Sequence, residues 1–319
     1  MKQPLIILTG PTAVGKTALS IRLAKAIGAE IISADSMQVY RHMDIGSAKV
    51  MPDEMGGIPH HLVDVLEPWD EFNVVRFQEM AKQAAEEIRS RNHIPLVVGG
   101  TGFYIQALLY DIDFTETGED TSYRRKMEEL AREKGDEYLH DMLRQVDPAS
   151  ADAIHFHNVK RVIRALEYFH QTGEKISEHN ERERQKESPY QFVYFVLNRE
   201  RSDLYERIDR RVDQMMEQGL LDEVKKLKAM GCTREMVSMQ GLGYKEMLSC
   251  LDGEISLEEA VYILKRDTRH FAKRQLTWFK RERDVTWIQA DGDEETLLGR
   301  MMPILVEKGI VPGDGAFTE

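Results

Sequence analysis

The stretch Gly10-Pro11-Thr12-Ala13-Val14-Gly15-Lys16-Thr17 decides the fold of this 319-residue chain. It fits the pattern G-x-x-x-x-G-K-[ST] of a phosphate-binding loop, or P-loop. The apolar run at 5–8 predicts a buried strand before the loop, and residues 18–27 repeat apolar side chains at helical spacing. Backbone N–H groups of such a loop and helix point at an anion. The stretch therefore predicts a polyphosphate site, in which Lys16 adds a charge and Thr17 offers a hydroxyl to Mg²⁺.

The composition is that of an ordinary globular protein, with 42% hydrophobic and 31% charged residues. No apolar run approaches the ~20 residues that a membrane span needs. The two cysteines, Cys232 and Cys250, have neither metal-ligand spacing nor a disulfide framework. We therefore expect a cytoplasmic protein with no membrane partner.

The net charge of −12 taken alone argues against a nucleic-acid partner, but the distribution of charge matters more than the sum. Basic residues gather at 265–283, and a second cluster is formed by Lys160, Arg161 and Arg164. Basic helical faces are often simply solvated. Two such clusters in an acidic chain also allow a polyanion site, and both interpretations stay open at this point.

The first hundred residues alternate between strand and helix patterns, which predicts a doubly wound parallel sheet. The expected elements after the P-loop helix are strands at 30–33, 62–65 and 95–98 and helices at 72–89 and 101–109.

Residues 115–188 then show helices and loops without a convincing strand. Helices are expected there at 123–133, 136–145, 148–154 and 158–172. A strand returns at 191–197, followed by helices at 204–218, 220–228, 243–251 and 257–281 and a last strand at 285–288. The predicted fold is a P-loop α/β core, residues 1–114 and 190–319, with an all-helical insertion domain at 115–189.

A carboxylate follows the second expected strand. P-loop proteins that hydrolyse ATP or GTP hold Mg²⁺ with a carboxylate on a later strand. Here the obvious later strand ends in Gly99-Gly100, which weakens a motor or switch interpretation. Asp35 instead lies where carboxyl ends of parallel strands meet at a ligand crevice. It can act as a general base, or it can simply cap a turn.

Seven motifs follow one another along the chain: Gly10–Thr17, Asp35-Ser36-Met37-Gln38-Val39-Tyr40, Met43-Asp44-Ile45-Gly46-Ser47-Ala48-Lys49, Gly99-Gly100-Thr101-Gly102-Phe103-Tyr104, Leu204-Tyr205-x-Arg207-Ile208-x-x-Arg211-Val212, Gly241-Leu242-Gly243-Tyr244 and Ala272-Lys273-Arg274-Gln275-x-x-Trp278. Together they resemble the motifs of a known family, the tRNA dimethylallyltransferases, also called tRNA isopentenyltransferases. The resemblance covers nearly the whole chain in order, and the absence of a C-terminal zinc finger makes it similar to the compact bacterial form.

The resemblance implies transfer of a prenyl group from dimethylallyl diphosphate to N6 of adenine 37, beside the anticodon of tRNA. The P-loop, with Mg²⁺ on Thr17, would hold the diphosphate leaving group. Asp35 would accept the N6 proton. Arg211 would reach the diphosphate from the other side. Arg207, four residues earlier, would join it or would be an exposed arginine paired with a carboxylate.

The resemblance also implies an RNA surface for the tRNA anticodon stem-loop, on a protein that we expect to be a monomer. Adenine 37 would be flipped out of its stack and would meet Ser36, Met37 and Gln38 next to Asp35. Thr101 would shape the channel, or serve as a helix N-cap. Further tRNA contacts are expected from Arg124, Lys160, Arg161, Val162, Ile163, Arg164, Lys273 and Arg274.

Three alternatives remain at this point. The chain could be a prenyltransferase that acts on free adenine nucleotides, a small-molecule P-loop kinase, or a non-catalytic RNA-binding protein. The intact Lys16, Thr17 and Asp35 argue against the last. The pair His60-His61 lacks the partner spacing of a metal site and is interpreted as an ordinary loop pair.

Overall fold

The structure, a computed structural model, describes residues 2–114 and 122–313. The chain forms two compact units. The core unit comprises Met1–Leu109 and Pro189–Glu319, and the helical unit comprises Tyr110–Ser188. The expected start of the insertion at residue 115 lies outside the described residues.

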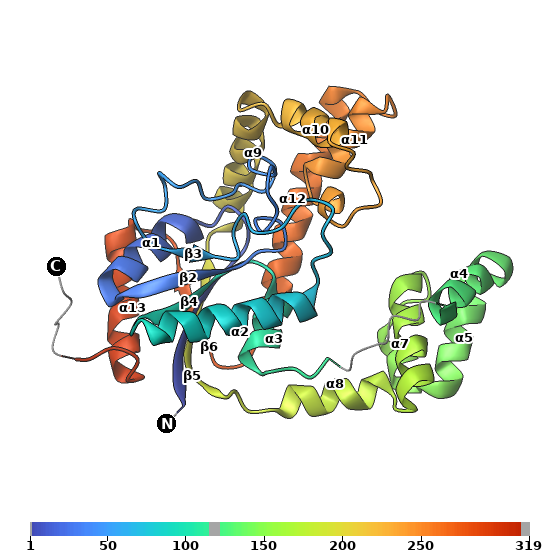
Figure 1. The fold of residues 1–319 in the computed structure, drawn as a ribbon, viewed down its shortest axis with the longest axis horizontal. Coiled ribbons are helices and arrows are strands. Elements are labelled where there is room, and N and C mark those ends of the chain that lie inside the picture. The colour runs from blue at the N-terminus through green and yellow to red at the C-terminus, as the bar shows by residue number, and fades with distance from the viewer. Residues whose placement is uncertain (1, 115–121, 314–319) are drawn as a thin grey trace. The chain divides into compact units, whose positions relative to one another are not determined.

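The core unit is built on a six-stranded, fully parallel sheet with the strand order β3-β2-β4-β1-β5-β6 (Figure 1). The four inner strands β2, β4, β1 and β5 are largely buried on both sides, as expected for a sheet that is covered on two faces. The strands are β1 (Gln3–Thr9), β2 (Ala29–Ala34), β3 (His60–His61), β4 (Ile94–Gly99), β5 (Tyr190–Asn198) and β6 (Val285–Gln289).

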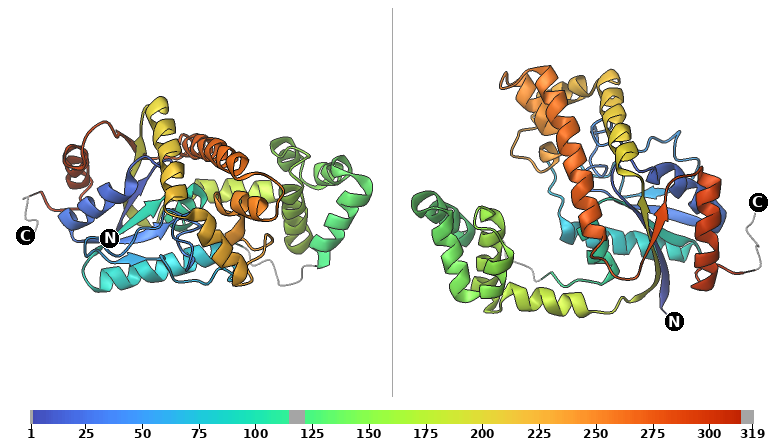
Figure 2. Two further views of the ribbon diagram at one scale, coloured as in Figure 1. Left: turned by 90° about the horizontal axis from the view of Figure 1, so that it is seen from above. Right: turned by 180° about the vertical axis from the view of Figure 1, so that it is seen from behind.

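Helices cover both faces of this sheet, so the predicted doubly wound fold is confirmed (Figures 1 and 2). Helices α1 (Lys16–Ile27) and α13 (Glu294–Glu307) pack against each other on one face, where they share an apolar cluster with β1 and β5. Helices α2 (Val74–Ser90) and α3 (Gly102–Leu109) pack together on the other. The remaining helices of this unit are α9 (Arg201–Glu217), α10 (Leu220–Ala229), the short 3₁₀ helix η1 (Ser238–Gln240), α11 (Tyr244–Leu251) and α12 (Leu257–Phe279).

The register of the sheet brings three loops to one place. Thr9 at the end of β1 is opposite Gly99 at the end of β4, and Ala34 at the end of β2 is also opposite Gly99. The Thr9 hydroxyl donates a hydrogen bond of 2.6 Å to the Gly99 carbonyl. The P-loop, the Asp35 turn and the Gly100-Thr101 turn therefore leave the sheet from adjacent positions.

The predicted strand at 62–65 is wrong. Leu62 and Asp64 have positive φ angles of 61° and 60°, which interrupt an extended conformation. The edge strand is instead the preceding pair, His60-His61, which pairs with β2 through Ile31 and Ile32. Helix α13, which the sequence analysis did not predict, begins at an N-cap Asp293 and contains Pro303 in its interior.

The helical unit has its own small core. Its helices are α4 (Ser122–Lys134), α5 (Asp136–Val146), α6 (Pro148–Ala153), α7 (Val159–Thr172) and α8 (Ile176–Gln185), of which the sequence analysis missed only the highly charged α8. The apolar side chains of α4, α5, α6 and α7 meet in one cluster, which includes Leu139, Leu143, Val162 and Leu166. Asp147 joins α6 to α8, because it accepts hydrogen bonds from Ser150 and Ser177.

A buried carboxylate stabilises the amino end of β2. Glu30 is 1% exposed and accepts two hydrogen bonds from Arg91, one contact from His93 and one from His61. The hydrogen bond from Arg91 is the main reason that the pKa of Glu30 falls from 4.5 to about 2. Because the folded state favours the ionised carboxylate, the cluster contributes stability at neutral pH.

We predict that Glu30→Gln lowers the free energy of unfolding at pH 7 by about 2 kcal/mol, because Arg91 and the two histidines lose their buried anionic acceptor. The pKa of Glu30 is depressed in the folded state, so its contribution is complete above about 4.5 and disappears as the pH falls toward 2. Urea titrations at several pH values should therefore show the difference between parent and variant shrinking in acid. The exposed Glu86→Gln serves as the control, and a difference that grows in acid would contradict the assignment.

Candidate active site

The side chain of Lys16 contacts the backbone of its own P-loop. The Lys16 ammonium donates hydrogen bonds of 2.9 Å to the carbonyls of Gly10 and Pro11. Burial is the main cause that lowers the pKa of Lys16 to about 7, followed by the nearby charge of Arg211, while Asp35 acts in the opposite direction. An anion in the loop would offset both of the effects that lower this pKa.

Two arginines of α9 reach the P-loop from outside. Arg207 Nε donates to the Ala13 carbonyl at 2.9 Å, and Arg211 Nη1 lies 3.5 Å from Thr12 Oγ1. Ala13 has a φ of 63°, which is unfavourable for a residue with a Cβ, so the bond from Arg207 stabilises a strained position. Arg207 is thus half-buried and contacts the P-loop, so it is not an exposed arginine that is paired only with a carboxylate. Burial, followed by the charge of Arg207, lowers the pKa of Arg211.

The sequence analysis missed Gln275 as a site residue. This buried side chain of α12 accepts a hydrogen bond from the Thr12 backbone N–H and donates one to the Gly100 carbonyl, each of 2.9 Å. It therefore connects the P-loop to the turn after β4. The contact also explains Gly100, because a Cβ there would lie 2.2 Å from the Gln275 amide nitrogen. The signal was present in the quoted motif around Gln275, but spacing alone does not show which loops a helix residue joins.

Asp35 occupies the turn that follows β2. Its Oδ1 accepts hydrogen bonds from the backbone N–H groups of Met37 (2.8 Å) and Gln38 (3.4 Å). The turn-capping interpretation is therefore correct for this oxygen. The same side chain also lies close enough to Lys16 and Arg211 to raise the pKa of both cations. Asp35 thus has both a local structural contact and a place beside the P-loop charges.

A cavity opens beside Lys16, Thr17 and Asp35. Its lining combines polar side chains with four aliphatic ones, Ile31, Val50, Val63 and Val98. The lining residues are Lys16, Thr17, Ser20, Ile31, Ser33, Asp35, Gln38, Val50, His60, Val63, Val98 and Gly99. Such a combination suits a ligand with an anionic end and a small apolar end.

Thr101 immediately precedes α3. Its carbonyl accepts the backbone N–H groups of Tyr104 and Ile105, so its main chain serves as the expected helix N-cap. Its own N–H donates to the Ala34 carbonyl at 3.2 Å, which ties it to the end of β2 next to Asp35. The position is therefore compatible with both interpretations of Thr101.

The expected tRNA-contacting residues fall on both units. In the core unit, Ser36, Met37 and Gln38 are half-buried beside Asp35, and Lys273 and Arg274 are exposed on α12. In the helical unit, Lys160, Arg161 and Arg164 are exposed on α7, while Val162 and Ile163 between them are buried in the unit's core. Arg124 forms an ion pair of 2.6 Å with the buried Glu167.

His60 and His61 contribute no metal site. Together they form β3 rather than a loop, and His61 contacts Glu30. Within residues 2–114 and 122–313, no three His, Cys, Asp or Glu side chains are grouped so that they could hold a metal ion. Over the same residues, no helix combines the length and the apolar character that crossing a membrane requires.

The fold defines a P-loop α/β protein, with a cavity beside the basic groups of its P-loop, and comparisons with known proteins narrow this class. The chain matches the family model described as IPP transferase over residues 38–282, and the model described as isopentenyl transferase over residues 3–64. It is 62% identical to a tRNA dimethylallyltransferase of Lachnoclostridium phytofermentans, over 97% of this chain and 99% of that protein. It is 49% identical to the enzyme of the same name from Carboxydothermus hydrogenoformans, with the same coverage.

Solved structures agree. The full-length tRNA isopentenylpyrophosphate transferase of Bacillus halodurans is 44% identical, with a TM-score of 0.73 and 97% of each chain covered. A eukaryotic dimethylallyltransferase captured acting on tRNA is 29% identical, with a TM-score of 0.81, and the match covers 97% of this chain and 79% of that one. The chain belongs to the tRNA dimethylallyltransferase family. The resemblance seen in the sequence is thereby confirmed, and with it the enzyme class; the kinase alternative is not favoured.

We predict that Gln275→Met, which keeps the side-chain volume but loses both hydrogen bonds, weakens pyrophosphate binding by about 5- to 30-fold. The reason is that the Thr12 N–H and the Gly100 carbonyl lose the contact that holds the P-loop to the neighbouring turn. Isothermal calorimetry measures the affinity, and Thr277→Val on the exposed side of the same helix is the control. Equal affinities for parent and Gln275→Met would show that the bridge does not support the loop.

Proposed function

We propose that the protein transfers the dimethylallyl group of dimethylallyl diphosphate to N6 of adenine 37 in tRNA and releases diphosphate. The observation that carries the proposal is the cavity in which Lys16 and Thr17 of the P-loop meet Asp35 and four aliphatic side chains, in a chain of this family. A prenyl diphosphate has an anionic end and an apolar end, and this lining suits both.

The diphosphate would bind to the P-loop amides, Lys16 and Arg211. Developing negative charge on the leaving oxygens is stabilised best by groups that are already in place. Lys16 would exchange its hydrogen bonds to the Gly10 and Pro11 carbonyls for contacts with the diphosphate. The negative charge of the diphosphate would keep the ammonium group protonated. Arg207 would support the loop through Ala13, and through its charge near Arg211 it adds to the positive field.

Mg²⁺ fits this site as a partner of the diphosphate. Magnesium usually takes one or two protein oxygens and completes its shell with water and phosphate oxygens. Thr17, at the start of α1, would supply the hydroxyl ligand, and its side chain lines the same cavity as Lys16. The ion would neutralise charge on the diphosphate when it is bound.

The five-carbon chain would lie against the aliphatic wall formed by Ile31, Val50, Val63 and Val98. The adenine N6 would then attack the allylic carbon as the bond from that carbon to the diphosphate oxygen breaks. Asp35 would take the proton that N6 loses, and the electron pair of the broken bond would stay on the diphosphate. The hydrogen bonds from the Met37 and Gln38 amides hold the Asp35 carboxylate in place for this proton transfer.

The acceptor adenine would leave the anticodon loop and meet the segment Ser36-Met37-Gln38, with Thr101 beside it. The exposed Lys273 and Arg274 on α12 support phosphate contacts by the core unit. The exposed Lys160, Arg161 and Arg164 support contacts by the helical unit, together with Arg124 on α4, a helix that packs against α7. Because Val162 and Ile163 are buried, we propose that they support the basic side chains rather than bind RNA themselves. We propose a monomer that works in the cytoplasm, where tRNA is processed.

The direct test is incubation of the protein with unmodified tRNA, Mg²⁺ and labelled dimethylallyl diphosphate. We expect label in the tRNA and release of diphosphate without ATP. Free adenosine monophosphate is the competing acceptor, and preferential labelling of the nucleotide would favour the free-nucleotide alternative. Phosphorylation of an acceptor with consumption of ATP would contradict the proposal altogether.

We predict that Asp35→Asn lowers single-turnover prenyl transfer by about 10²-fold or more, the usual contribution of a positioned base. Asparagine keeps an oxygen that can accept the Met37 N–H, so tRNA affinity and the melting temperature should change little. Rapid-quench measurements at saturating tRNA and donor isolate the chemical step. A rate within a few-fold of the parent would exclude Asp35 as the base.

We predict that reversing the charge of both Lys160 and Arg161 weakens tRNA binding and flattens its salt dependence. Each lost phosphate contact lowers the slope of log K against log salt by about one. Activity at saturating tRNA should fall far less than affinity. Lys134 and Arg132 on α4 provide a control pair of equal charge change. An unchanged slope in a folded variant would place the RNA contacts elsewhere.

A further inference from the structure

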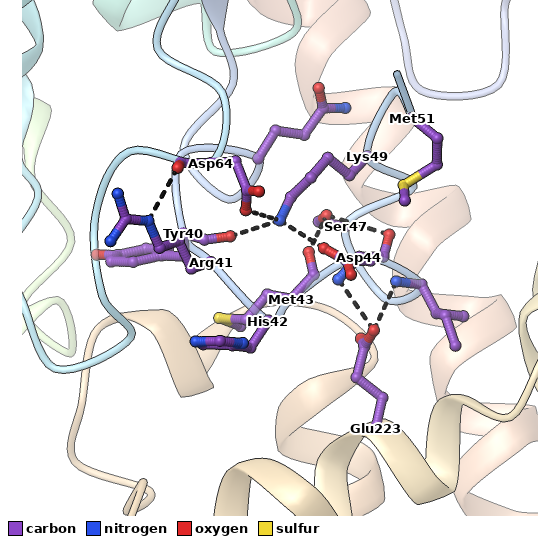
Figure 3. A network of polar contacts seen from close by, with 12 residues as sticks. Tyr40, Arg41, His42, Met43, Asp44, Ser47, Lys49, Met51, Asp64 and Glu223 are labelled. Carbon is purple, nitrogen blue, oxygen red and sulfur yellow. Dashed lines mark hydrogen bonds and ion pairs between the residues drawn. The ribbon is translucent and has the colours of Figure 1, made fainter. Parts of the chain in front are cut away.

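A buried carboxylate of α10 holds a loop that is distant in sequence. Glu223 is 8% exposed, and its Oε2 accepts hydrogen bonds from the backbone N–H groups of Asp44 (2.9 Å) and Ile45 (2.8 Å). Its Oε1 accepts a third from Gly46 at 3.1 Å. Figure 3 shows the side chain rising from its helix into this loop. Consecutive amides around one carboxylate form a strong anion cradle.

Tyr244 of α11 completes the contact. Its hydroxyl donates to Glu223 Oε1 at 2.9 Å and accepts the Ser47 N–H at 3.1 Å, so two side chains satisfy four consecutive amides. Burial and the charge of Glu223 keep the pKa of Tyr244 well above its usual range, so the group remains a hydroxyl donor. A Cβ on Gly46 would lie 2.6 Å from the tyrosine ring, which explains the glycine at this position.

The held loop is in turn connected to the segment that carries the base. Lys49 is buried and donates to the Tyr40 carbonyl (2.7 Å) and to the carboxylates of Asp44 (2.6 Å) and Asp64 (2.7 Å), as Figure 3 shows. Gln38 Nε2 donates to the Ala48 carbonyl at 3.2 Å.

Residues 35–59 between β2 and β3 form one long loop, and such a loop needs anchors to keep a single conformation. The anchors described above are side chains of the loop itself and of α10 and α11. The P-loop has separate supports, since Gln275 and Arg207 contact Thr12 and Ala13. The P-loop and the loop 35–59 are thus held by different helices, the first by α9 and α12 and the second by α10 and α11.

We propose that Glu223, together with Tyr244, is a positioning residue that sets the segment Asp35–Gln38 for the acceptor adenine. The pair acts through the loop 44–49 and does not touch substrate. Loss of the Glu223–Tyr244 contact displaces the segment Asp35–Gln38, which faces the adenine, and leaves the P-loop in place. The inference rests on the proposed function, because it assigns the acceptor to this segment.

The test uses the full chain and three readouts: the KM for tRNA, the kcat, and the dissociation constant for pyrophosphate. In Glu223→Gln, an amide nitrogen replaces one acceptor in the cradle. We expect the KM for tRNA to rise between about 3- and 30-fold and the kcat to fall, with pyrophosphate affinity within twofold of the parent. Tyr244→Phe removes one hydroxyl from the same cradle and should change the same parameters by less.

Two control variants separate positioning from a change of charge or of stability. Asp222→Asn is the same change of charge one residue earlier, on an exposed side chain of α10, and should leave all three values unchanged. Glu30→Gln destabilises the fold at the other end of β2 and should lower the melting temperature without changing the KM for tRNA.

An unchanged KM for tRNA in both Glu223→Gln and Tyr244→Phe would overturn the inference. A loss of pyrophosphate affinity as large as the rise in the KM for tRNA would also overturn it. If Glu223→Gln does not fold, Tyr244→Phe alone decides. Failure of the parent protein to prenylate tRNA would instead refute the proposed function, so the two failures are distinguishable.

Discussion

The candidate active site depends on the common end of three parallel strands. Thr9, Gly99 and Ala34 occupy one row across β1, β4 and β2, and backbone hydrogen bonds of the sheet fix that row. A shift of one residue in any of these strands would exchange the side chains that point to the two faces of the sheet and would displace the loop that follows the strand. The P-loop, Thr101 and Asp35 are neighbours because the register is strict.

A second requirement is that the irregular loops satisfy their backbone groups. Strand ladders end where these loops begin, so side chains of the C-terminal helices supply the missing partners. Gln275 forms hydrogen bonds with Thr12 and Gly100, and Arg207 forms one with Ala13. Glu223 accepts hydrogen bonds from the amides of residues 44–46. Helices that follow the helical unit in sequence thereby shape loops that precede it.

The charge distribution is consistent with these roles. The acidic side chains in the core are neutralised locally, as Glu30 is by Arg91, or they are used to hold backbone amides, as Glu223 is. Burial lowers the pKa of both Lys16 and Arg211, and the charge of a neighbouring arginine lowers each further. An anionic group beside them would raise both values, which supports the proposed diphosphate site. The exposed lysines and arginines of α7 and α12 support the proposed contacts with RNA.

The sequence by itself determined the P-loop, the parallel α/β core, the helical composition of residues 122–185, and the family. These features are local, because a loop pattern or an apolar period can be recognised within a short window. It also indicated Asp35 through the general rule on strand ends, although the roles of the predicted site residues remain proposals. Local patterns misled at 62–65, where two left-handed residues replace a strand, and they missed the interior-proline helix α13. Only the tertiary structure decided what Gln275, Arg207, Glu223 and Tyr244 contact, because each joins segments more than twenty residues apart or on different elements. Such contacts depend on how helices pack around the sheet, and no spacing within the sequence encodes them.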